Sequence, residues 1–350
     1  MAGSESGELQ QRMLDEAATA VRALTVAIGV RLGLYKAMSG AGRLTPAELA
    51  ARTGTDEVYV REWLHAQVSG GYLEHDPVRD TYLLTDQYAA VLADPTSPTY
   101  GAGFFPVLQY LYATEDKLVD AFRTGEGVAW FERGPGFDQS LGRFFLPNYE
   151  ASLVRKWLPA LDGVTDALTA GIRVADVGCG EGHSTLLMAE AFPNSRFVGF
   201  DYSAAPIANA KALAEERGLS DRVDFQLATA ENYPDGPYDL VTMFNCLHDL
   251  GNPQAAAGKI LKSLTPAGTW MLVEPNAAAE LAGNQHPAGR LFLSLSVVMC
   301  LPVAVADEGP HALGNHAGEA ALRDIALAAG FSQWRRATES AVSAVYEIRP

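Results

Sequence analysis

The stretch Val174-Ala-Asp-Val-Gly-Cys-Gly-Glu-Gly-His183 decides the fold of this chain. An apolar segment with strand character, residues 172–177, runs directly into three glycines at alternate positions, and a helical pattern follows. Glycine adopts the backbone conformations of a tight turn and lets the backbone approach a ligand closely. We therefore predict a strand, a ligand-binding turn and a helix at this position.

The spacing of the glycines narrows the type of ligand. A dinucleotide fingerprint of the form G-x-G-x-x-G would need its third glycine at position 183, which is His183, and no G-x-x-x-x-G-K-[ST] motif is present. Asp201 ends the next predicted strand, 21 residues after Gly180. A carboxylate at that place can accept both ribose hydroxyls of an adenosine. The pattern favours an adenosine-containing cofactor other than NAD or FAD.

Strand and helix patterns alternate along the second half of the chain, which is typical of a mostly parallel, doubly wound α/β sheet. The end of the chain, residues 331–348, has the pattern of two further strands in a hairpin. The other predicted strands are Ile172–Val177, Phe197–Asp201, Val223–Leu227, Leu240–Phe244 and Trp270–Glu274.

The first 100 residues have a different pattern. Residues 10–37 are predicted to form one long helix that is apolar on nearly every face from Ala17 to Leu34, so it must be buried, either against a second subunit or inside its own chain. We expect a homodimer. Thr45, Pro46 and Glu48 predict a capped helix that ends at Gly54, and Thr55 is expected to cap another helix, reaching to about Ser69.

A hairpin is predicted around the turn of residues 76–80, and helix, short helix, helix, hairpin is a winged-helix pattern. Many winged helices bind DNA, but residues 1–110 carry 8 basic and 13 acidic side chains, a net charge of −5. The predicted recognition helix, residues 56–69, has three acids against Arg61 alone. Reading DNA requires Lys and Arg, so a dimerisation module is the preferred interpretation.

The whole chain has 350 residues, 48% of them apolar, and a net charge of −16, which predicts about two globular domains and disfavours nucleic acid and anionic membrane surfaces. Leu291–Ala306, the longest apolar stretch, is interrupted by polar residues and a proline and is expected not to span a membrane. No signal peptide is recognisable, and the three cysteines have neither metal nor disulfide spacing. These features predict a cytoplasmic protein.

The glycine-rich stretch, together with Val198-Gly-Phe-Asp-Tyr-Ser203, resembles class I S-adenosylmethionine-dependent methyltransferases. With the winged-helix front half, the chain resembles dimeric small-molecule O-methyltransferases and bacterial winged-helix methyltransferases over most of its length. The resemblance implies a Rossmann-like, seven-stranded sheet whose last strand is antiparallel. It also implies three regions: a winged-helix dimerisation domain (1–100), a helical segment that forms part of the substrate pocket (101–150) and a cofactor-binding methyltransferase domain (151–350).

The resemblance also assigns the cofactor site. It places the glycines of the turn beside the amino-acid part of S-adenosylmethionine, Asp201 on the ribose and Tyr202 on the adenine, with further contacts from the turn after the third strand. In that family the region after the fifth strand helps to close the acceptor pocket, which makes Leu291, Phe292, Leu295 and Met299 candidate walls. The predicted cofactor-binding residues are Asp176, Gly178, Gly180, Gly182, Asp201, Tyr202, Ala230, Glu231 and Asn245.

The segment Phe244-Asn-Cys-Leu-His-Asp-Leu-Gly-Asn-Pro253 is similar to the Leu-His-Asp-Trp segment of plant-type O-methyltransferases, in which the His is the general base. The resemblance assigns that role to His248 and the orienting role to Glu274; Leu250 replaces the Trp. Chemistry favours the same pair, because a hydroxyl acceptor gains when a base removes its proton, and a carboxylate fixes the tautomer of a His. A capping or core His at position 248 is the alternative.

The prediction is a methyltransferase that modifies an oxygen of a small, largely apolar acceptor, a phenol, an enol or a carboxylic acid, and releases S-adenosylhomocysteine. Two other classes remain open. One is a transcription regulator that binds S-adenosylmethionine, and the other is a tailoring enzyme, such as a cyclase, that keeps the cofactor without methyl transfer. A metal site of His248 with His286, His311 and His316 is not predicted, because no ligand pair has helical i, i+4 spacing.

Overall fold

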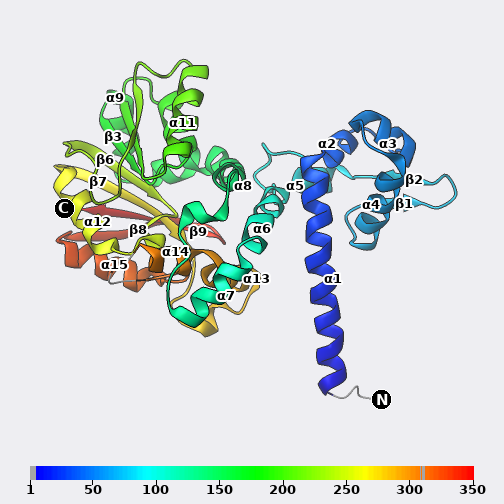
Figure 1. Cartoon of the computed structure of the whole chain (residues 1–350). Helices are drawn as coiled ribbons and strands as arrows, with labels where there is room; N and C mark the ends of the chain where they lie inside the picture. Colours follow the sequence, from blue (N-terminus) through cyan, green and yellow to red (C-terminus); the bar gives the residue numbers. More distant parts are fainter. Residues whose placement is uncertain (1–4, 308, 310–311) are drawn as a thin grey trace. The chain divides into compact units, whose positions relative to one another are not determined.

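The computed structural model describes residues 5–307, 309 and 312–350. The chain divides between Tyr110 and Leu111 into two compact units, each with its own core (Figure 1). The two units are considered separately below.

The first unit is mainly helical, with one small hairpin. Pro46 at the first helical position and the reciprocal hydrogen bonds of Thr45 and Glu48 start α3, and Gly54 ends it in the left-handed conformation, as predicted. The elements are α1 (Glu5–Arg31), α2 (Leu34–Met38), α3 (Pro46–Thr53), α4 (Glu57–Ser69), β1 (Glu74–Asp76), β2 (Thr81–Leu83), α5 (Asp86–Leu92), the 3-10 turn η1 (Ala102–Phe104) and α6 (Phe105–Tyr112), which crosses the division.

Two predictions for this unit are wrong in detail. The long helix does not run from residue 10 to 37; it begins at Glu5 and breaks after Arg31, because Gly33 adopts a left-handed backbone with φ 69°. Asp56, not Thr55, caps α4, since its carboxylate accepts a hydrogen bond from the backbone N–H of Val58 at 2.9 Å. The Thr55 hydroxyl pairs instead with Thr53.

The second unit begins with helices and continues as an alternation of strands and helices. Its helical start comprises α7 (Glu115–Thr124), η2 (Trp130–Arg133), α8 (Phe137–Ser152), the π-helical turn η3 (Leu153–Trp157), η4 (Leu158–Ala160) and α9 (Val164–Ala170). The remainder comprises β3 (Arg173–Val177), α10 (His183–Ala191), β4 (Arg196–Asp201), α11 (Ala204–Glu216), β5 (Val223–Leu227), β6 (Tyr238–Phe244), η5 (Leu247–Asp249), α12 (Pro253–Ser263), β7 (Leu264–Pro275), η6 (Leu281–Asn284), α13 (Pro287–Leu295), the π-helical turn η7 (Ser296–Cys300), α14 (Leu301–Ala306), α15 (Gly318–Ala329), β8 (Gln333–Glu339) and β9 (Ser343–Arg349).

The strands form one seven-stranded sheet in the order β5-β4-β3-β6-β7-β9-β8. Strand β9, the last in the chain, runs antiparallel to both of its neighbours, and the pairs among the other strands from β5 to β7 are parallel. The predicted α/β fold with a seven-stranded sheet and an antiparallel last strand is therefore confirmed. The order reverses between β3 and β6, which creates a ligand-binding crevice at their carboxyl ends.

Both faces of the sheet are covered, because the strands present apolar side chains alternately to each side. Val174 packs in the layer of α9, α10 and α11, and its neighbour Ala175 packs in the layer of α12 and α15 (Figure 1). The predicted strand boundaries agree with the structure within two residues, except that β7 starts six residues before Trp270.

The apolar region after β7 forms a helix that starts four residues before the apolar stretch Leu291–Ala306. Residues Pro287–Ala306 form a continuous 20-residue helix that is apolar and long enough to cross a membrane by length and composition, and 44% of its most apolar window is buried within the structure. The hydroxyl of Ser294 donates to the carbonyl of Arg290 within α13, so this serine does not interrupt the helix. Pro302 has no N–H for the carbonyl of Val298, and the guanidinium of Arg133 donates to that carbonyl instead at 3.1 Å. Partial burial is also found for core helices of soluble proteins.

Candidate active site

A cavity of about 450 Å³ lies at the carboxyl ends of β3, β4 and β6, within the second unit. Its volume is in the range of small-molecule and cofactor sites. Its wall combines the glycine-rich turn, the ends of three strands, aromatic side chains of residues 130–149 and the end of α14.

The glycine-rich turn forms the floor of this cavity. Gly178, Gly180 and Gly182 all have positive φ, between 51° and 74°. A Cβ atom on Gly178 would lie 2.4 Å from the sulfur of Cys246, so only glycine lets the turn pass this close to the segment that follows β6. A Cβ on Gly180 would meet nothing within 4 Å, which leaves the space above this residue open for a ligand.

Asp201 is held beside this floor by the backbone. Each of its carboxylate oxygens accepts one backbone N–H at 2.9 Å, Oδ2 from Gly180 and Oδ1 from Ser203, so the carboxylate is fixed where Asp201 borders the cavity. Burial raises its pKa to about 6, against the lowering effect of these two hydrogen bonds. The carboxylate is thus positioned to accept the hydroxyls of a ribose.

Two residues of the predicted cofactor set lie outside the cavity wall. Asp176 is fully buried under the turn, where its carboxylate accepts hydrogen bonds from the hydroxyls of Ser184, Thr185 and Thr242 at 2.6–2.9 Å. This network braces the junction of β3 and α10. Gly182 faces Phe225, since a Cβ on it would lie 2.5 Å from that ring. Both residues shape the turn rather than border the ligand space.

The remaining predicted contacts border the cavity. Tyr202 follows Asp201, and its ring is half exposed. Ala230 and Glu231 lie in the turn after β5, on the same wall. Asn245 directly follows β6 and has φ 49°, a left-handed conformation that Asn tolerates better than most residues. The structure therefore brings together the ends of β4, β5 and β6, as the parallel sheet requires.

His248 and Glu274 meet in the interior, below the cavity wall. The Nδ1 atom of His248 and a carboxylate oxygen of Glu274 form a short hydrogen bond, and the second oxygen accepts the backbone N–H of Leu247 at 2.9 Å. Both residues are at most 3% exposed. His248 does not border the cavity; its neighbours Cys246, Asp249 and Leu250 do.

The charge around His248 favours its protonated form. Burial lowers the pKa of the imidazole, but the carboxylates of Asp249 and Glu274 outweigh burial and raise it well above its usual value. The Nε2 atom lies 3.3 Å from Oδ1 of Asp249. Burial raises the pKa of Asp249 itself, while the nearby His248 lowers it.

The cavity wall is acidic. Six carboxylate side chains border it, and the described part of the wall contains neither Lys nor Arg. Such a wall does not suit the pyrophosphate of a dinucleotide, and it suits a cofactor that carries positive charge. The six are Asp138, Glu181, Asp201, Glu231, Asp249 and Asp307.

Several wall residues were not predicted from the sequence. Asp138 accepts a hydrogen bond from the indole N–H of Trp130 at 2.6 Å, and both residues border the cavity. At the other end, Val303, Ala306 and Asp307 form the wall, in place of Leu291, Phe292, Leu295 and Met299, because the residues at the carboxyl end of the 20-residue helix are the ones that reach the cavity. The sequence could have indicated Asp249 as a wall residue, because it directly follows His248.

The other histidines do not gather around His248 in the described residues. His286 caps α13, accepting the N–H of Gly289 at 3.3 Å, and His311 lies outside the described residues. The group of metal-ligand atoms that contains His248 has Asp249 and Cys300 as its other members, without His316.

Two family models match the chain. Residues 168–293 match a methyltransferase domain, and residues 20–94 match the Rv2258c-like winged HTH domain. The chain carries a methyltransferase domain preceded by a winged-helix domain. The predicted family resemblance is thus confirmed at the level of these two domains.

Curated relatives match about a third of the chain. The trans-aconitate 2-methyltransferase of Streptomyces avermitilis is 43% identical over 126 residues, which is 35% of this chain and 44% of the relative. The demethylmenaquinone methyltransferase of Thermus thermophilus is 31% identical over 102 residues, 29% of this chain and 46% of the relative. The chain spans less than half the length of these relatives.

Solved structures match over the full length. A structure described as an O-methyltransferase of Nostoc punctiforme superimposes with a TM-score of 0.74 at 18% identity and covers 100% of both chains. Human N-acetylserotonin methyltransferase, solved with S-adenosylmethionine, gives a TM-score of 0.70 at 17% identity over 99% of both chains. The methyltransferase domain and the winged-helix domain together thus have the fold of these O-methyltransferases.

Proposed function

We propose that this protein is an S-adenosylmethionine-dependent methyltransferase that acts on an oxygen of a small molecule. The observation that carries the proposal is the cavity formed by the glycine-rich turn and the anchored carboxylate of Asp201. The glycine turn, Asp201 and Tyr202 would hold the amino-acid, ribose and adenine parts of the cofactor. When bound, the cofactor supplies an electrophilic methyl group on a sulfonium, whose positive charge suits the acidic wall.

The chain's own residues would act on the acceptor. Aromatic side chains such as Trp130, Phe145 and Tyr149 line the same cavity and would hold an apolar ring at attack distance. The acceptor hydroxyl would donate its hydrogen bond to Asp249 at the cavity wall. Its proton would pass through that carboxylate to Nε2 of His248, which lies 3.3 Å behind it and is oriented by Glu274. A neutral phenol or enol fits this wall better than a carboxylic acid, because no described cation there pairs with a carboxylate.

A methyl-transfer screen over phenols, enols, carboxylic acids and 2-oxo acids, read by mass spectrometry, tests the proposal. We expect methylated phenols or enols together with S-adenosylhomocysteine in equal amount. Cofactor binding without any methylated product across the screen would favour a cyclase-type tailoring enzyme instead. The His248→Ala variant should lose roughly 10²–10⁴-fold in turnover and keep its cofactor affinity. The exposed His65→Ala variant is the matched control.

We also propose that α1 mediates a homodimer and that the protein works in the cytoplasm. Large apolar side chains of this helix are 41–69% exposed at helical spacing, and a second copy would cover them. The three free cysteines suit a reducing compartment. The exposed face consists of Val21, Leu24 and Ile28 on α1 and Leu32 just after it.

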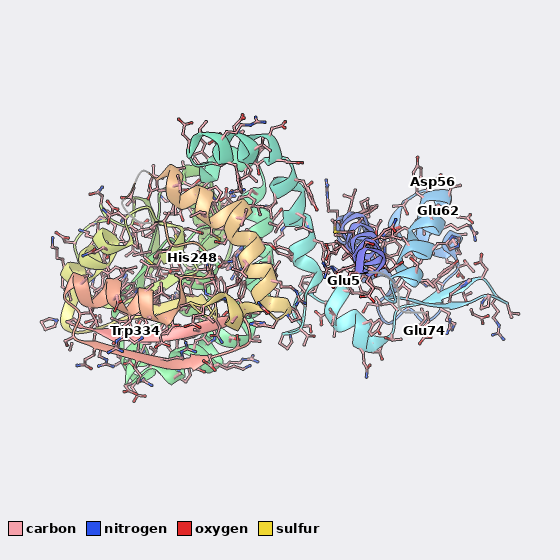
Figure 2. The ribbon with its side chains drawn as sticks, turned by 90° about the horizontal axis from the view of Figure 1, so that it is seen from below. Glu5, Asp56, Glu62, Glu74, His248 and Trp334 are labelled. Carbon is pink, nitrogen blue, oxygen red and sulfur yellow. The ribbon has the colours of Figure 1, made fainter. Side chains whose placement is uncertain are left out.

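A DNA-binding role for the winged-helix domain has support from its fold alone. Asp56, Glu62 and Glu74 lie on this domain (Figure 2), where a DNA-binding surface would need Lys and Arg. We propose a scaffold role for it. A gel-shift series at low salt should show no sequence-selective complex, and a selective shift would favour the regulator.

A further inference from the structure

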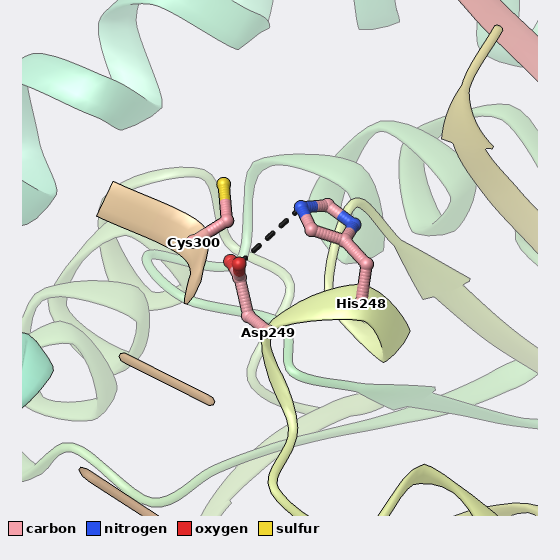
Figure 3. A group of neighbouring side chains, drawn as sticks. All are labelled: His248, Asp249 and Cys300. Carbon is pink, nitrogen blue, oxygen red and sulfur yellow. Dashed lines mark ion pairs between the residues drawn. The ribbon is translucent and has the colours of Figure 1, made fainter. Parts of the chain in front are cut away.

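A cluster of three potential metal ligands lies next to the cavity. His248 and Asp249 come from the 3-10 turn η5, and Cys300 comes from the π-helical turn η7, 51 residues later in the chain than Asp249. Figure 3 shows the three side chains pointing toward one another. One ligand atom from each lies within 4.8 Å of the other two, and His248 and Cys300 are almost completely buried.

The donor set is that of a zinc-type site. Zn²⁺ binds imidazole nitrogen, carboxylate oxygen and thiolate sulfur at about 2.0–2.3 Å, which places tetrahedral ligands roughly 3.3–3.8 Å apart. The distance of 3.3 Å from Nε2 of His248 to Oδ1 of Asp249 already has this value. The cysteine sulfur needs to approach by about 1 Å at most to complete the set.

The surroundings of the cluster also match a metal site. Glu274 binds Nδ1 of His248, which leaves Nε2 as the nitrogen that faces the cluster; metal-bound histidines are typically held in this way by a second carboxylate. Among the described residues, the buried Oδ1 of Asp249 has an ion-pair contact with Nε2 of His248 at 3.3 Å and makes no hydrogen bond. A cation would satisfy this oxygen.

The turn that carries Cys300 is held rigidly. A π-helical turn frees backbone carbonyls, and here the buried guanidinium of Arg133 donates to the carbonyls of Val298 and Met299 at 3.1 and 3.2 Å. π-helical turns are found frequently at functional sites. Asp249 borders the cavity, so it provides an entry for a cation and for a fourth ligand from solvent or substrate.

We propose that His248, Asp249 and Cys300 bind a thiophilic divalent cation of the Zn²⁺ or Co²⁺ type. Binding releases two protons, that of the Cys300 thiol and that on Nε2 of His248, because a metal ligand must be a thiolate or a neutral imidazole. With one carboxylate and one thiolate, the three ligands and the divalent cation are electrically neutral. The site itself depends only on the geometry above. Its effect on catalysis rests on the proposed function: a cation on Nε2 occupies the lone pair that a general base needs, so an occupied site should slow methyl transfer.

Titration of the full-length, reduced and chelator-treated protein with Co²⁺ tests the site by optical spectroscopy. We expect one equivalent to give the near-ultraviolet thiolate-to-cobalt charge-transfer band and the intense visible bands of tetrahedral cobalt. Addition of Zn²⁺ should displace the Co²⁺ and abolish both the charge-transfer band and the visible bands. Absence of the charge-transfer band in the wild-type protein overturns the proposal.

Two variants and one control assign the ligands. Cys300→Ser should lose the charge-transfer band, and Asp249→Asn should weaken Co²⁺ binding at least tenfold with the band retained at saturation. Cys179→Ser, which changes another buried cysteine, should keep both the band and the affinity. An unchanged band in a folded Cys300→Ser protein overturns the assignment, and the Asp249→Asn titration decides the question if that variant does not fold.

Turnover of the cobalt-loaded protein tests the proposed function independently of the metal site. Slower methyl transfer at full occupancy is the expected result. Unchanged turnover with a fully developed cobalt spectrum leaves the metal site intact and contradicts the role of His248 as a base.

Discussion

The Nδ1 atom of His248 is hydrogen-bonded to the carboxylate of Glu274, although 26 residues separate them in the chain. The pairing follows from the sheet: β6 and β7 are parallel neighbours, so the turn after one ends beside the end of the other. Glu274 is itself fixed by the backbone N–H of Leu247. The imidazole is therefore held in one orientation before any substrate binds, and its Nε2 atom faces Asp249.

Glu274→Gln removes the charge and leaves one acceptor oxygen, for the N–H of His248 or for that of Leu247. A neutral amide no longer stabilises the imidazolium, so we expect turnover to fall by about 10²-fold or more with little change in cofactor affinity. Steady-state kinetics with S-adenosylhomocysteine titration measures both quantities. Equal turnover of variant and wild type would remove Glu274 from the mechanism.

The pH dependence of turnover should reflect the effect that the two carboxylates beside His248 have on the pKa of its imidazole. A base must be neutral, and because Asp249 and Glu274 raise the pKa of His248 well above 6.5, turnover should rise with pH on the alkaline side of that value. Asp249→Asn removes one raising charge, so the midpoint should move to lower pH. A profile of kcat from pH 5 to 10 checks this, and a midpoint that does not move contradicts it.

Cofactor affinity should depend on the ionisation of Asp201. Its pKa is raised to about 6 by burial, so the carboxylate is lost as the pH falls through that value and binding of S-adenosylhomocysteine should weaken. Asp201→Asn should bind roughly 10–100-fold more weakly, since a hydrogen bond to a charged group contributes about 1.5–3 kcal/mol. Calorimetry between pH 5 and 8 should show that the variant's affinity for S-adenosylhomocysteine does not change with pH, whereas that of the wild-type protein does.

Substitutions at two glycines of the turn should affect protein stability and cofactor binding to different extents. Gly182→Ala places a methyl group 2.5 Å from Phe225 at φ 74° and should destabilise the protein by about 2–4 kcal/mol. Gly180→Ala meets no atom within 4 Å and should lose only about 1–2 kcal/mol from its positive φ. Thermal unfolding should rank them in this order, while cofactor affinity should fall more for Gly180→Ala. The reverse ranking would contradict the packing described.

The exposed apolar face of α1 leads to a prediction about the oligomeric state of the protein. Leu24→Glu places a charge in the middle of the exposed face, so a dimer should dissociate while the fold of each chain is kept. Sedimentation velocity of the variant and of Val78→Glu, a residue 91% exposed in the hairpin turn, compares the two. A monomeric wild-type protein would contradict the dimer directly.

Local sequence patterns were sufficient for most elements. The strands from β3 to β6 and the terminal hairpin were predicted to within two residues, because alternating apolar side chains and glycine turns are local signals. Misplaced boundaries have local causes too: Gly33 ended α1 early, and Asp56 replaced Thr55 as the cap of α4. The helix from Pro287 to Ala306 extends beyond the apolar stretch Leu291–Ala306, and Pro302 does not break it because Arg133 binds the carbonyl that the proline leaves free, a contact distant in sequence.

The sequence by itself determined the doubly wound fold, the glycine-rich turn and the carboxylate of Asp201 at the end of its strand. These features depend on residues close together in the chain and on the rule that parallel strands end at one edge. Only the tertiary structure decided which side chains meet there. Asp176 and Gly182 turned inward to support the turn, whereas Asp138 reached the wall from a distant helix. Cys300 met His248 because tertiary packing, which no local pattern encodes, brought the π-helical turn η7 close to η5.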